Sequence, residues 1–547
     1  MLRRRELLRM SLMGGAAVAG SSLAPLFARA ALANESASAG PVVKTTSGKI
    51  RGALSNGVYS FKGVPYGAST GGAARFLPPA LPKPWSGVRD ALQLGTLAPQ
   101  NLSSANSPSD IRRAMGDIFG PGEVGEDCLV LNIWTAGLRG KRPVMVWLHG
   151  GGYTGGSDGA PTYDGANLAH KRDVVVVGIN HRLNVFGYLY LGGLGGEKYA
   201  DSGNAGMLDI VLSLEWVRDN IGHFGGDPGN VTIFGESGGG GKVSTLMAMP
   251  RAKGLFHKAI VESGSTLRVS TRDEADAAAR KFLAQLKIAP EHVADLANVP
   301  MSDMLAALRA MNGPNSIRLG PVVDGRSLPR QPFDPDAPEQ SANIPMIIGT
   351  NATESTALLG IADASLFSLS DADMHAKLKS YLHLTDESQV ESLVAVYRKD
   401  RPDATPSDIY FAVTTDRMMR MNAITQAERK AAQHAAPAYM YRFDWRSPVL
   451  GGKMRSPHGI EMGFVFDNTD KTAGMNGTGA DLLPLAEKVS SAWAAFAHTG
   501  NPSHPGIPNW PAYTLPDRAT MLFNDECKVV NDPGRNERLA ISALPTA

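Results

Sequence analysis

Short apolar runs alternate with longer amphipathic stretches along most of this chain. The apolar runs have the length of buried strands; they cover residues 144–148, 174–179, 231–234, 259–262, 346–349 and 438–443. The longer stretches carry hydrophobic residues at helical spacing; they cover residues 271–288, 302–311, 386–399, 407–434 and 482–498. Strands that are interleaved with helices in this way predict an α/β fold.

The predicted strand at residues 231–234 runs into a glycine-framed serine and then into a helical pattern. Gly235-Glu-Ser237-Gly-Gly239 has the Gly-x-Ser-x-Gly form of a nucleophile elbow, in which a tight strand-to-helix turn exposes the serine hydroxyl. Glycines on both sides leave room for the strained backbone of that turn. A second match, Gly155-Gly-Ser157-Asp-Gly159, has no strand directly before it and no helix after it, so we interpret Ser157 as a loop residue.

A glycine-rich loop, His149-Gly-Gly-Gly152-Tyr153, follows the predicted strand at residues 144–148. Acyl-transfer enzymes aim backbone N–H groups at the oxyanion that develops during the reaction. A loop of this kind supplies such groups together with the residue after the nucleophile, here Gly238. The loop therefore supports Ser237 as the nucleophile.

These segments match two nucleotide-binding motifs only in part. Gly150, Gly152 and Gly155 fit the spacing of a dinucleotide fingerprint, which also needs a helix opening on the last glycine and an acid after the next strand. The sequence indicates neither of them. A phosphate-binding loop ending at Lys242 would need Gly at position 236 and Ser or Thr at position 243, where the chain has Glu236 and Val243.

Further motifs follow one another along the chain: Phe61-Lys-Gly-Val-Pro-Tyr66, Glu126-Asp-Cys-Leu-Val-Leu-Asn-Ile-Trp134, Asn180-His-Arg-Leu-Asn-Val-Phe-Gly187, Gly203-Asn-Ala-Gly-Met-Leu-Asp209, a block at residues 216–228, and Glu262-Ser-Gly264. In this order they resemble the type-B carboxylesterases, the cholinesterase-like branch of the α/β-hydrolases. The resemblance runs from about residue 45 to the C-terminus. It implies one α/β-hydrolase domain over residues 43–547, after a linker at 34–42. Its twisted, mostly parallel central sheet would carry helices on both faces, with helical insertions that wall a gorge.

The resemblance also implies the catalytic residues. The family places its acid in a Gly-x-Asn-x-x-Glu block, matched by Gly349-Thr-Asn-Ala-Thr-Glu354, and its histidine in a His-Gly-x-Glu block, matched by His458-Gly-Ile-Glu461. The implied triad is Ser237, Glu354 and His458, in the chain order of this fold. Glu236 and Glu461 match family carboxylates near the triad, where they would tune the imidazolium or hold a water molecule, and Ser263 is expected beside the triad with them. We interpret the other histidines of the conserved-looking motifs as packing or loop residues; they are His149, His181 and His223.

The mechanism implied by the resemblance is ester hydrolysis through an acyl-enzyme. His458 would take the proton of Ser237, Glu354 would hold the imidazole, and the amides of Gly151, Gly152 and Gly238 would stabilise the oxyanion. No cofactor is implied, and no metal-ligand spacing such as Cys-x-x-Cys or His-Glu-x-x-His occurs. The expected partner is a small, uncharged carboxylic ester, and the oligomeric state stays open. The alternatives are a non-catalytic cholinesterase-like binding module, or amidase or lipase activity on the same scaffold.

Two glycine features suggest a hypothesis on substrate scope. Family members with the three-glycine form of the loop, here Gly150-Gly-Gly152, are associated with esters of bulky tertiary alcohols. Most relatives have Ala after the nucleophile, whereas this chain has Gly238. The hypothesis is that Gly238 leaves room for the alcohol, because it lacks a Cβ atom.

Residues 1–33 are predicted to be a twin-arginine signal peptide. Arg4-Arg5 precedes an apolar region that Gly and Ala dilute, and cleavage would follow Ala33 or Ala30. The apolar region at residues 11–27 is too short and too rich in breakers for a stable membrane span. The expected location is the periplasm or the medium, without stable membrane insertion after cleavage.

Charge and cysteine content narrow the function classes further. Residues 1–33 hold five Arg and one Glu, so 49 basic and 51 acidic side chains remain after cleavage. Such a balance does not suggest nucleic-acid binding. Cys128 and Cys527 are the only cysteines, which excludes a disulfide scaffold. Where family members often have a partner for Cys128, this chain has Ala98, so Cys128 is expected to be a small buried residue.

Overall fold

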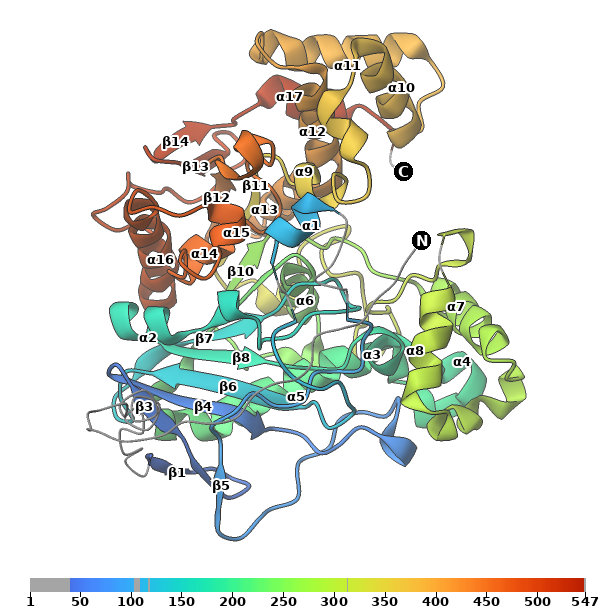
Figure 1. Ribbon diagram of the computed structural model, residues 1–547, viewed down its shortest axis with the longest axis vertical. Coiled ribbons are helices and arrows are strands. Elements are labelled where there is room, and N and C mark those ends of the chain that lie inside the picture. Colours follow the sequence, from blue (N-terminus) through green and yellow to red (C-terminus); the bar gives the residue numbers. More distant parts are fainter. Residues whose placement is uncertain (1–39, 103–108, 117–118, 312, 546–547) are drawn as a thin grey trace, which may run out of the picture. The chain divides into compact units, whose positions relative to one another are not determined.

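A central sheet of eleven strands organises the fold (Figure 1). The computed structural model describes residues 40–102, 109–116, 119–311 and 313–545, so the predicted signal peptide lies outside the described residues. One compact unit spans Pro41–Ala547. In spatial order, the strands of the large sheet are β14 (Lys528–Asn531), β13 (Ala519–Phe523), β12 (Ala438–Phe443), β11 (Met346–Asn351), β10 (Lys258–Glu262), β9 (Gly226–Glu236), β7 (Arg142–Leu148), β8 (Val175–Ile179), β6 (Val130–Thr135), β4 (Val58–Pro65) and β3 (Ala53–Ser55). A small second sheet holds β1 (Val42–Lys44), β2 (Lys49–Arg51) and β5 (Val88–Asp90).

The seven strands from β8 to β13 in this order pair in parallel, and the edges are antiparallel. β6, β4 and β3 close one edge and β14 closes the other. All the strands predicted from apolar runs belong to the parallel part, which confirms the mostly parallel α/β sheet. These strands are buried on both faces, which is why they are continuous apolar runs in the sequence.

Helices cover both faces of the sheet. The helices of the described chain are α1 (Asp110–Ala114), α2 (Ala166–Arg172), α3 (Asn184–Tyr188), α4 (Gly192–Gly195), α5 (Ala205–Asn220), α6 (Gly238–Leu246), α7 (Arg272–Gln285), α8 (Met301–Ala310), α9 (Ser355–Leu358), α10 (Asp371–Tyr381), α11 (Glu387–Asp400), α12 (Pro406–Thr415), α13 (Met421–Ala431), α14 (Met462–Val465), α15 (Ala473–Asn476), α16 (Leu482–Thr499) and α17 (Arg535–Ser542). Side chains of β7 alternate between two cores, because successive residues of a strand point to opposite faces. Val144, Val146 and Leu148 pack with α5, α6 and α13, whereas Met145 and Trp147 pack with α2, α14 and α16.

Two helical insertions form apolar clusters of their own. α10, α11 and α12 pack together around Leu378, Leu393 and Phe411. α7 and α8 pack with α3 around Phe282 and Met304. The first group lies beyond β11, and the second lies near α3 and α4 (Figure 1). These groups agree with the expectation of helical insertions beside the central sheet.

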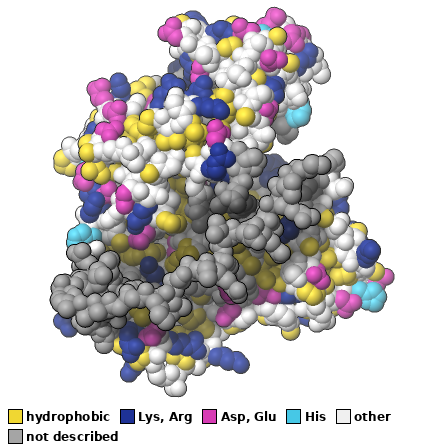
Figure 2. All heavy atoms as spheres, in the orientation of Figure 1, with side chains coloured by type: hydrophobic (Ala, Val, Ile, Leu, Met, Phe, Trp, Pro, Cys, Tyr) yellow, Lys and Arg dark blue, Asp and Glu magenta, His cyan; other side chains and the backbone are white. Residues whose placement is uncertain are grey.

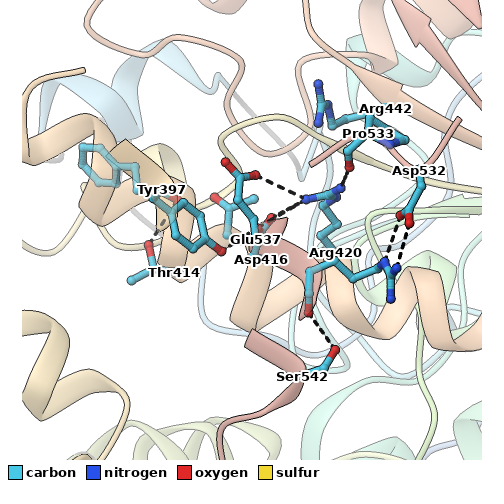
Figure 3. Close-up of polar contacts among 12 residues, drawn as sticks. Tyr397, Thr414, Asp416, Arg420, Arg442, Asp532, Pro533, Glu537 and Ser542 are labelled. Atoms are coloured by element: carbon cyan, nitrogen blue, oxygen red, sulfur yellow. Dashed lines mark hydrogen bonds and ion pairs between the residues drawn. The ribbon is translucent and has the colours of Figure 1, made fainter. Parts of the chain in front are cut away.

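The predicted helix at residues 407–434 is interrupted in the structure. It consists of α12, a π-helical segment at Asp416–Arg420 and α13. The interruption places Asp416 and Arg420 in a buried ionic cluster with Glu537 of α17 (Figure 3). π-Helical turns are often found where side chains are aimed at a particular task. Here the turn itself contacts α17 and brings its charged side chains to that helix.

The surface mixes both signs of charge. On the face shown in Figure 2, Lys and Arg side chains are interspersed with Asp and Glu side chains, and neither sign forms a continuous field. Among the described residues, no helix is both long and apolar enough to cross a membrane. Cys128 and Cys527 are free and buried, which confirms the expectation for Cys128.

Candidate active site

Ser237 occupies a strained turn between β9 and α6. Its backbone has φ 56° and ψ −123°, a conformation that residues other than glycine rarely adopt. A Cβ atom on Gly235 would lie 2.6 Å from the Leu148 carbonyl oxygen, and one on Gly239 would lie 1.9 Å from it. The N–H of Ser237 donates to the Glu262 carbonyl at 2.8 Å. The glycines of the predicted elbow are therefore required by the close approach of β7.

Glu354 and His458 come together although about a hundred residues separate them. Oε2 of Glu354 lies 2.6 Å from Nδ1 of His458. Oε1 of Glu354 accepts from the Ser263 hydroxyl at 2.6 Å and from the Asn351 N–H at 2.7 Å. Both side chains are buried. Glu354 is thus fixed on three sides and can orient the imidazole ring.

The outer nitrogen of His458 faces a second carboxylate. Nε2 lies 3.1 Å from Oε1 of Glu236, yet neither atom has a hydrogen-bond partner among the described residues. Glu461 lies behind the ring, where its Oε2 accepts from Asn351 Nδ2 at 2.6 Å. Nε2 is the atom that would exchange a proton with Ser237. Glu236 therefore lies next to the position where that proton moves.

The carboxylates around His458 perturb one another. Burial opposes a charged imidazolium, but Glu236 and Glu354 outweigh it and raise the pKa of His458 to about 10. Burial, together with the charge of Glu354, raises the pKa of Glu236 to about 7. Burial likewise raises the pKa of Glu262 to about 8 and that of Glu461 well above its usual value. Perturbed groups that gather in this way are typical of catalytic sites.

The glycine loop places its backbone against the elbow. Gly151 has φ 87° and Gly152 has φ 64°, and a Cβ on Gly151 would lie 2.3 Å from the Gly155 carbonyl oxygen. The N–H groups of Gly151, Gly152 and Gly238 donate no hydrogen bond to any residue that the structure describes. They remain free to donate to an oxyanion.

The structure indicates that glycine is needed at position 238 for a different reason from the one expected. A Cβ atom there would lie 2.1 Å from the Gly152 carbonyl oxygen and 2.5 Å from its Cα. The backbone of the loop thus fills the space that was expected to receive the alcohol. Gly238 allows the loop and the elbow to approach each other.

Lys242 was not predicted to be part of the site, but it connects the loop to α6. The ammonium group is buried and donates to the His149 carbonyl at 3.0 Å and to the Gly152 carbonyl at 2.9 Å. It also lies over the Tyr153 ring at 5.4 Å from the centroid. Burial lowers its pKa to about 7. A lysine within a helix that is otherwise uncharged was the one sequence signal that could have identified it.

The remaining candidates are structural. His149 and His181 stack with ring centroids 4.8 Å apart, and burial lowers the pKa of His149 to about 3. Ser157 is buried in a loop and hydrogen-bonds to the Phe119 carbonyl and the Gly159 N–H, as its interpretation required. Within the described ranges, no group of His, Cys, Asp and Glu side chains could hold a metal ion.

Comparisons with known proteins identify the family of this chain. A family model described as the carboxylesterase family matches residues 39–542. Para-nitrobenzyl esterase of Bacillus subtilis (strain 168) is 37% identical over 508 residues, which cover 91% of this chain and 97% of the relative. Phenmedipham hydrolase of Pseudarthrobacter oxydans is 31% identical, covering 92% and 99%. The solved carboxylesterase EST55 of Geobacillus stearothermophilus superposes with a TM-score of 0.77 at 36% identity, covering 91% and 99%.

Proposed function

The chain belongs to the carboxylesterase family and hydrolyses carboxylic esters, and we propose that it does so as a serine esterase with Ser237, His458 and Glu354 as its triad. The observation that carries this proposal is the 2.6 Å contact between Glu354 and His458 Nδ1. The opposite nitrogen, Nε2, lies 3.1 Å from Glu236, the residue that precedes Ser237 on the elbow. A buried carboxylate on one nitrogen leaves the other free to act as a base. The same arrangement recurs in serine hydrolases on several folds.

In the proposed reaction, neutral His458 accepts the Ser237 proton as the hydroxyl oxygen attacks the ester carbonyl. The amides of Gly151, Gly152 and Gly238 stabilise the negative oxygen of the tetrahedral intermediate. His458 then returns the proton to the leaving alcohol, and an acyl-enzyme remains. Water repeats these steps, releasing the acid and restoring Ser237.

The carboxylates near the ring set the conditions for this base. Because Glu236 and Glu354 favour the imidazolium, the proton stays on His458 to higher pH than on a free imidazole. The reactive neutral form increases as pH rises. The apparent pKa of kcat/KM is therefore expected above the usual histidine value of about 6.5.

A fluorophosphonate probe and a series of 4-nitrophenyl esters from acetate to palmitate test the proposal. The probe should label Ser237, and labelling should fail in the Ser237→Ala protein. Hydrolysis of short esters with little activity on long ones would separate an esterase from the lipase alternative, and matched anilides would test amidase activity. An active enzyme that the probe does not label would contradict the serine mechanism.

We also propose that the protein is exported by the twin-arginine route, on the strength of Arg4-Arg5 and the residues that follow. Fractionation of cells that express the full chain should place activity outside the cytoplasm. Replacing both arginines by lysine should retain it inside. Equal distribution of the two proteins would contradict the proposal.

A further inference from the structure

A cleft of about 1040 Å³ opens beside the nucleophile elbow. Its lining includes Tyr153, which follows Gly152 of the glycine loop, and Ser265, which follows Gly264. Gly264 packs directly on the elbow, because a Cβ atom there would lie 2.1 Å from the Ser237 carbonyl oxygen. Two segments that line the cleft are thus continuous with the glycine loop and with the residue that packs on the elbow, although Ser237 and His458 are not part of the lining. Its volume suits a drug-sized ligand.

The charged side chains that line the cleft are mainly arginines. They are Arg268, Arg318, Arg417 and Arg429, with Asp334 as the acid among them. Asp334 pairs with Arg268 at 2.7 Å and with Arg429 at 3.0 Å. A single carboxylate is thus shared by two guanidinium groups.

The other two arginines have no carboxylate partner within the described residues. Arg417 donates to the Pro545 carbonyl at 2.6 Å, a neutral acceptor. Arg318 makes no hydrogen bond or ion pair with the part of the chain that the structure describes. Its charge lowers the pKa of Tyr153 against the larger effect of burial, which raises it to about 12. Arg318 therefore acts on the residue that follows the glycine loop.

One acid outside the lining offsets part of the charge of Arg318. Glu274, in the first turn of α7, is within electrostatic reach of Arg318 and Arg268. Its carboxylate accepts from the Thr271 N–H at 2.8 Å and from the Thr271 hydroxyl at 3.0 Å, closing a helix cap. Glu274 is not among the residues that line the cleft. The lining therefore keeps an excess of positive charge.

Apolar side chains share the cleft with these arginines. Leu267, Val269, Leu319 and Met421 belong to the same lining. A ligand that fits such a lining carries both an apolar chain and an anionic group. Guanidinium groups are well suited to bind a carboxylate, since their planar donors match its two oxygens.

We infer that the cleft binds the remote carboxylate of the substrate, so that the enzyme prefers monoesters of dicarboxylic acids to neutral esters of equal length. This inference rests on the proposed function, and it departs from the uncharged ester expected from the sequence. The chemistry of hydrolysis is unchanged. The arginines bind the far end of the substrate and leave the reacting atoms to the triad.

Mono-4-nitrophenyl esters of adipic, suberic and sebacic acid test this inference against 4-nitrophenyl alkanoates of equal chain length. Rates without enzyme are subtracted, because a carboxylate can attack its own ester. The ratio of kcat/KM for charged over neutral ester should exceed one for at least one chain length. It should fall as salt is added, because exposed charges are screened.

Variants locate the effect in the cleft. Arg318→Gln and Arg417→Gln should each lower the ratio by about two- to fivefold, the range of a partly exposed ion pair. Arg251→Gln is the matched control, since Arg251 lies outside the cleft and pairs with Glu215 at 3.4 Å; it should leave the ratio unchanged. A ratio of one or less at every length, or a ratio that neither cleft variant lowers, overturns the inference. Neutral esters report on the proposed function independently, so loss of all hydrolysis would instead count against the esterase proposal.

Discussion

Two buried charged regions of this protein differ in how their carboxylates are compensated. Around His458 the carboxylates of Glu236, Glu354 and Glu461 converge on one imidazole ring. In the cluster between the π-helical turn and α17, arginines accompany the acids (Figure 3). There Arg420 lies 3.3 Å from Asp416 and 3.9 Å from Glu537, and Tyr397 donates to Asp416 at 2.7 Å.

The difference shows how burial acts on charge in the two regions. At the active site, burial of the Glu236 carboxylate outweighs the attraction of His458 and Lys242. The pKa of Glu236 therefore rises to about 7, and protons can move near neutral pH. Beside the ionic cluster, Asp532 pairs with Arg538 at 2.7 Å. Burial would raise the pKa of Asp532, but Arg538 outweighs it and the pKa is lowered. One region keeps groups that can exchange protons, and the other keeps fixed charges that hold helices together.

The largest expected effect is the loss of turnover when a residue of the proposed triad is replaced. Ser237→Ala and His458→Ala should each reduce turnover by about 10⁴- to 10⁶-fold, and Glu354→Gln somewhat less, because the acid only orients the ring. Folding should remain intact, as measured by thermal unfolding. Ser157→Ala is the matched control and should keep its turnover. If Ser237→Ala retained a tenth of the activity, another residue would be the nucleophile.

The opposite result is expected in the ionic cluster. Glu537→Gln leaves Arg401 without its ion-pair partner and Arg420 with Asp416 alone. Because the Arg401 side chain is 35% exposed, the loss should stay below the roughly 3–5 kcal/mol of a fully buried pair. Urea unfolding should report this loss in the free energy of unfolding. The pH profile of kcat/KM should not move, and a shift of that profile would show that the two regions are coupled.

A third test concerns the proposed oxyanion hole, whose candidate donors are the backbone amides of Gly151, Gly152 and Gly238. Gly238→Ala should push Gly152 away and lower kcat about 10²- to 10³-fold, the usual effect of losing one oxyanion donor. Because the displaced group is the loop, the rates of hydrolysis of ethyl acetate and of tert-butyl acetate should fall by the same factor. A larger loss on tert-butyl acetate would restore the hypothesis that Gly238 makes room for the alcohol.

Glu236→Gln sharpens the comparison through the pH profile. The charge of Glu236 favours the imidazolium, so its removal should lower the pKa of His458. The rising limb of kcat/KM should then move to lower pH. The matched control is Glu262→Gln, whose carboxyl is not among the groups that raise the pKa of His458. An unmoved limb in Glu236→Gln would mean that Glu236 is already neutral during catalysis.

The last test concerns stability as a function of pH. Burial raises the pKa of Glu262 from 4.5 to about 8, so the folded state holds its proton more tightly than the unfolded state. Its contribution to stability is complete below about pH 4.5 and is lost as pH rises towards 8. Glu262→Gln should therefore flatten the decline in the free energy of unfolding over this range. Asp532 gives the opposite dependence on pH. Because its pKa is lowered in the folded state, its contribution to stability is present above the ordinary pKa of an aspartate and is lost as the pH falls.

Much of the fold followed from local patterns, whereas the charged regions did not. The strands at the centre of the sheet are apolar runs because both faces are buried, and the elbow is visible because its glycines are required by steric contact. α5 was missed because almost every residue of it is buried, so it has no polar face and no helical period. The environments of Glu262 and Lys242 depend on residues far away in the sequence, and no local pattern encodes them.

Lys242 also bears on when the nucleophile and the glycine loop take up their relative positions. Its ammonium group ties the carbonyls of His149 and Gly152 to α6, the helix that begins directly after Ser237. The nucleophile and the amides of the loop are thereby parts of one rigid body. Their arrangement is completed once, when the chain folds, and does not have to be rebuilt in each turnover.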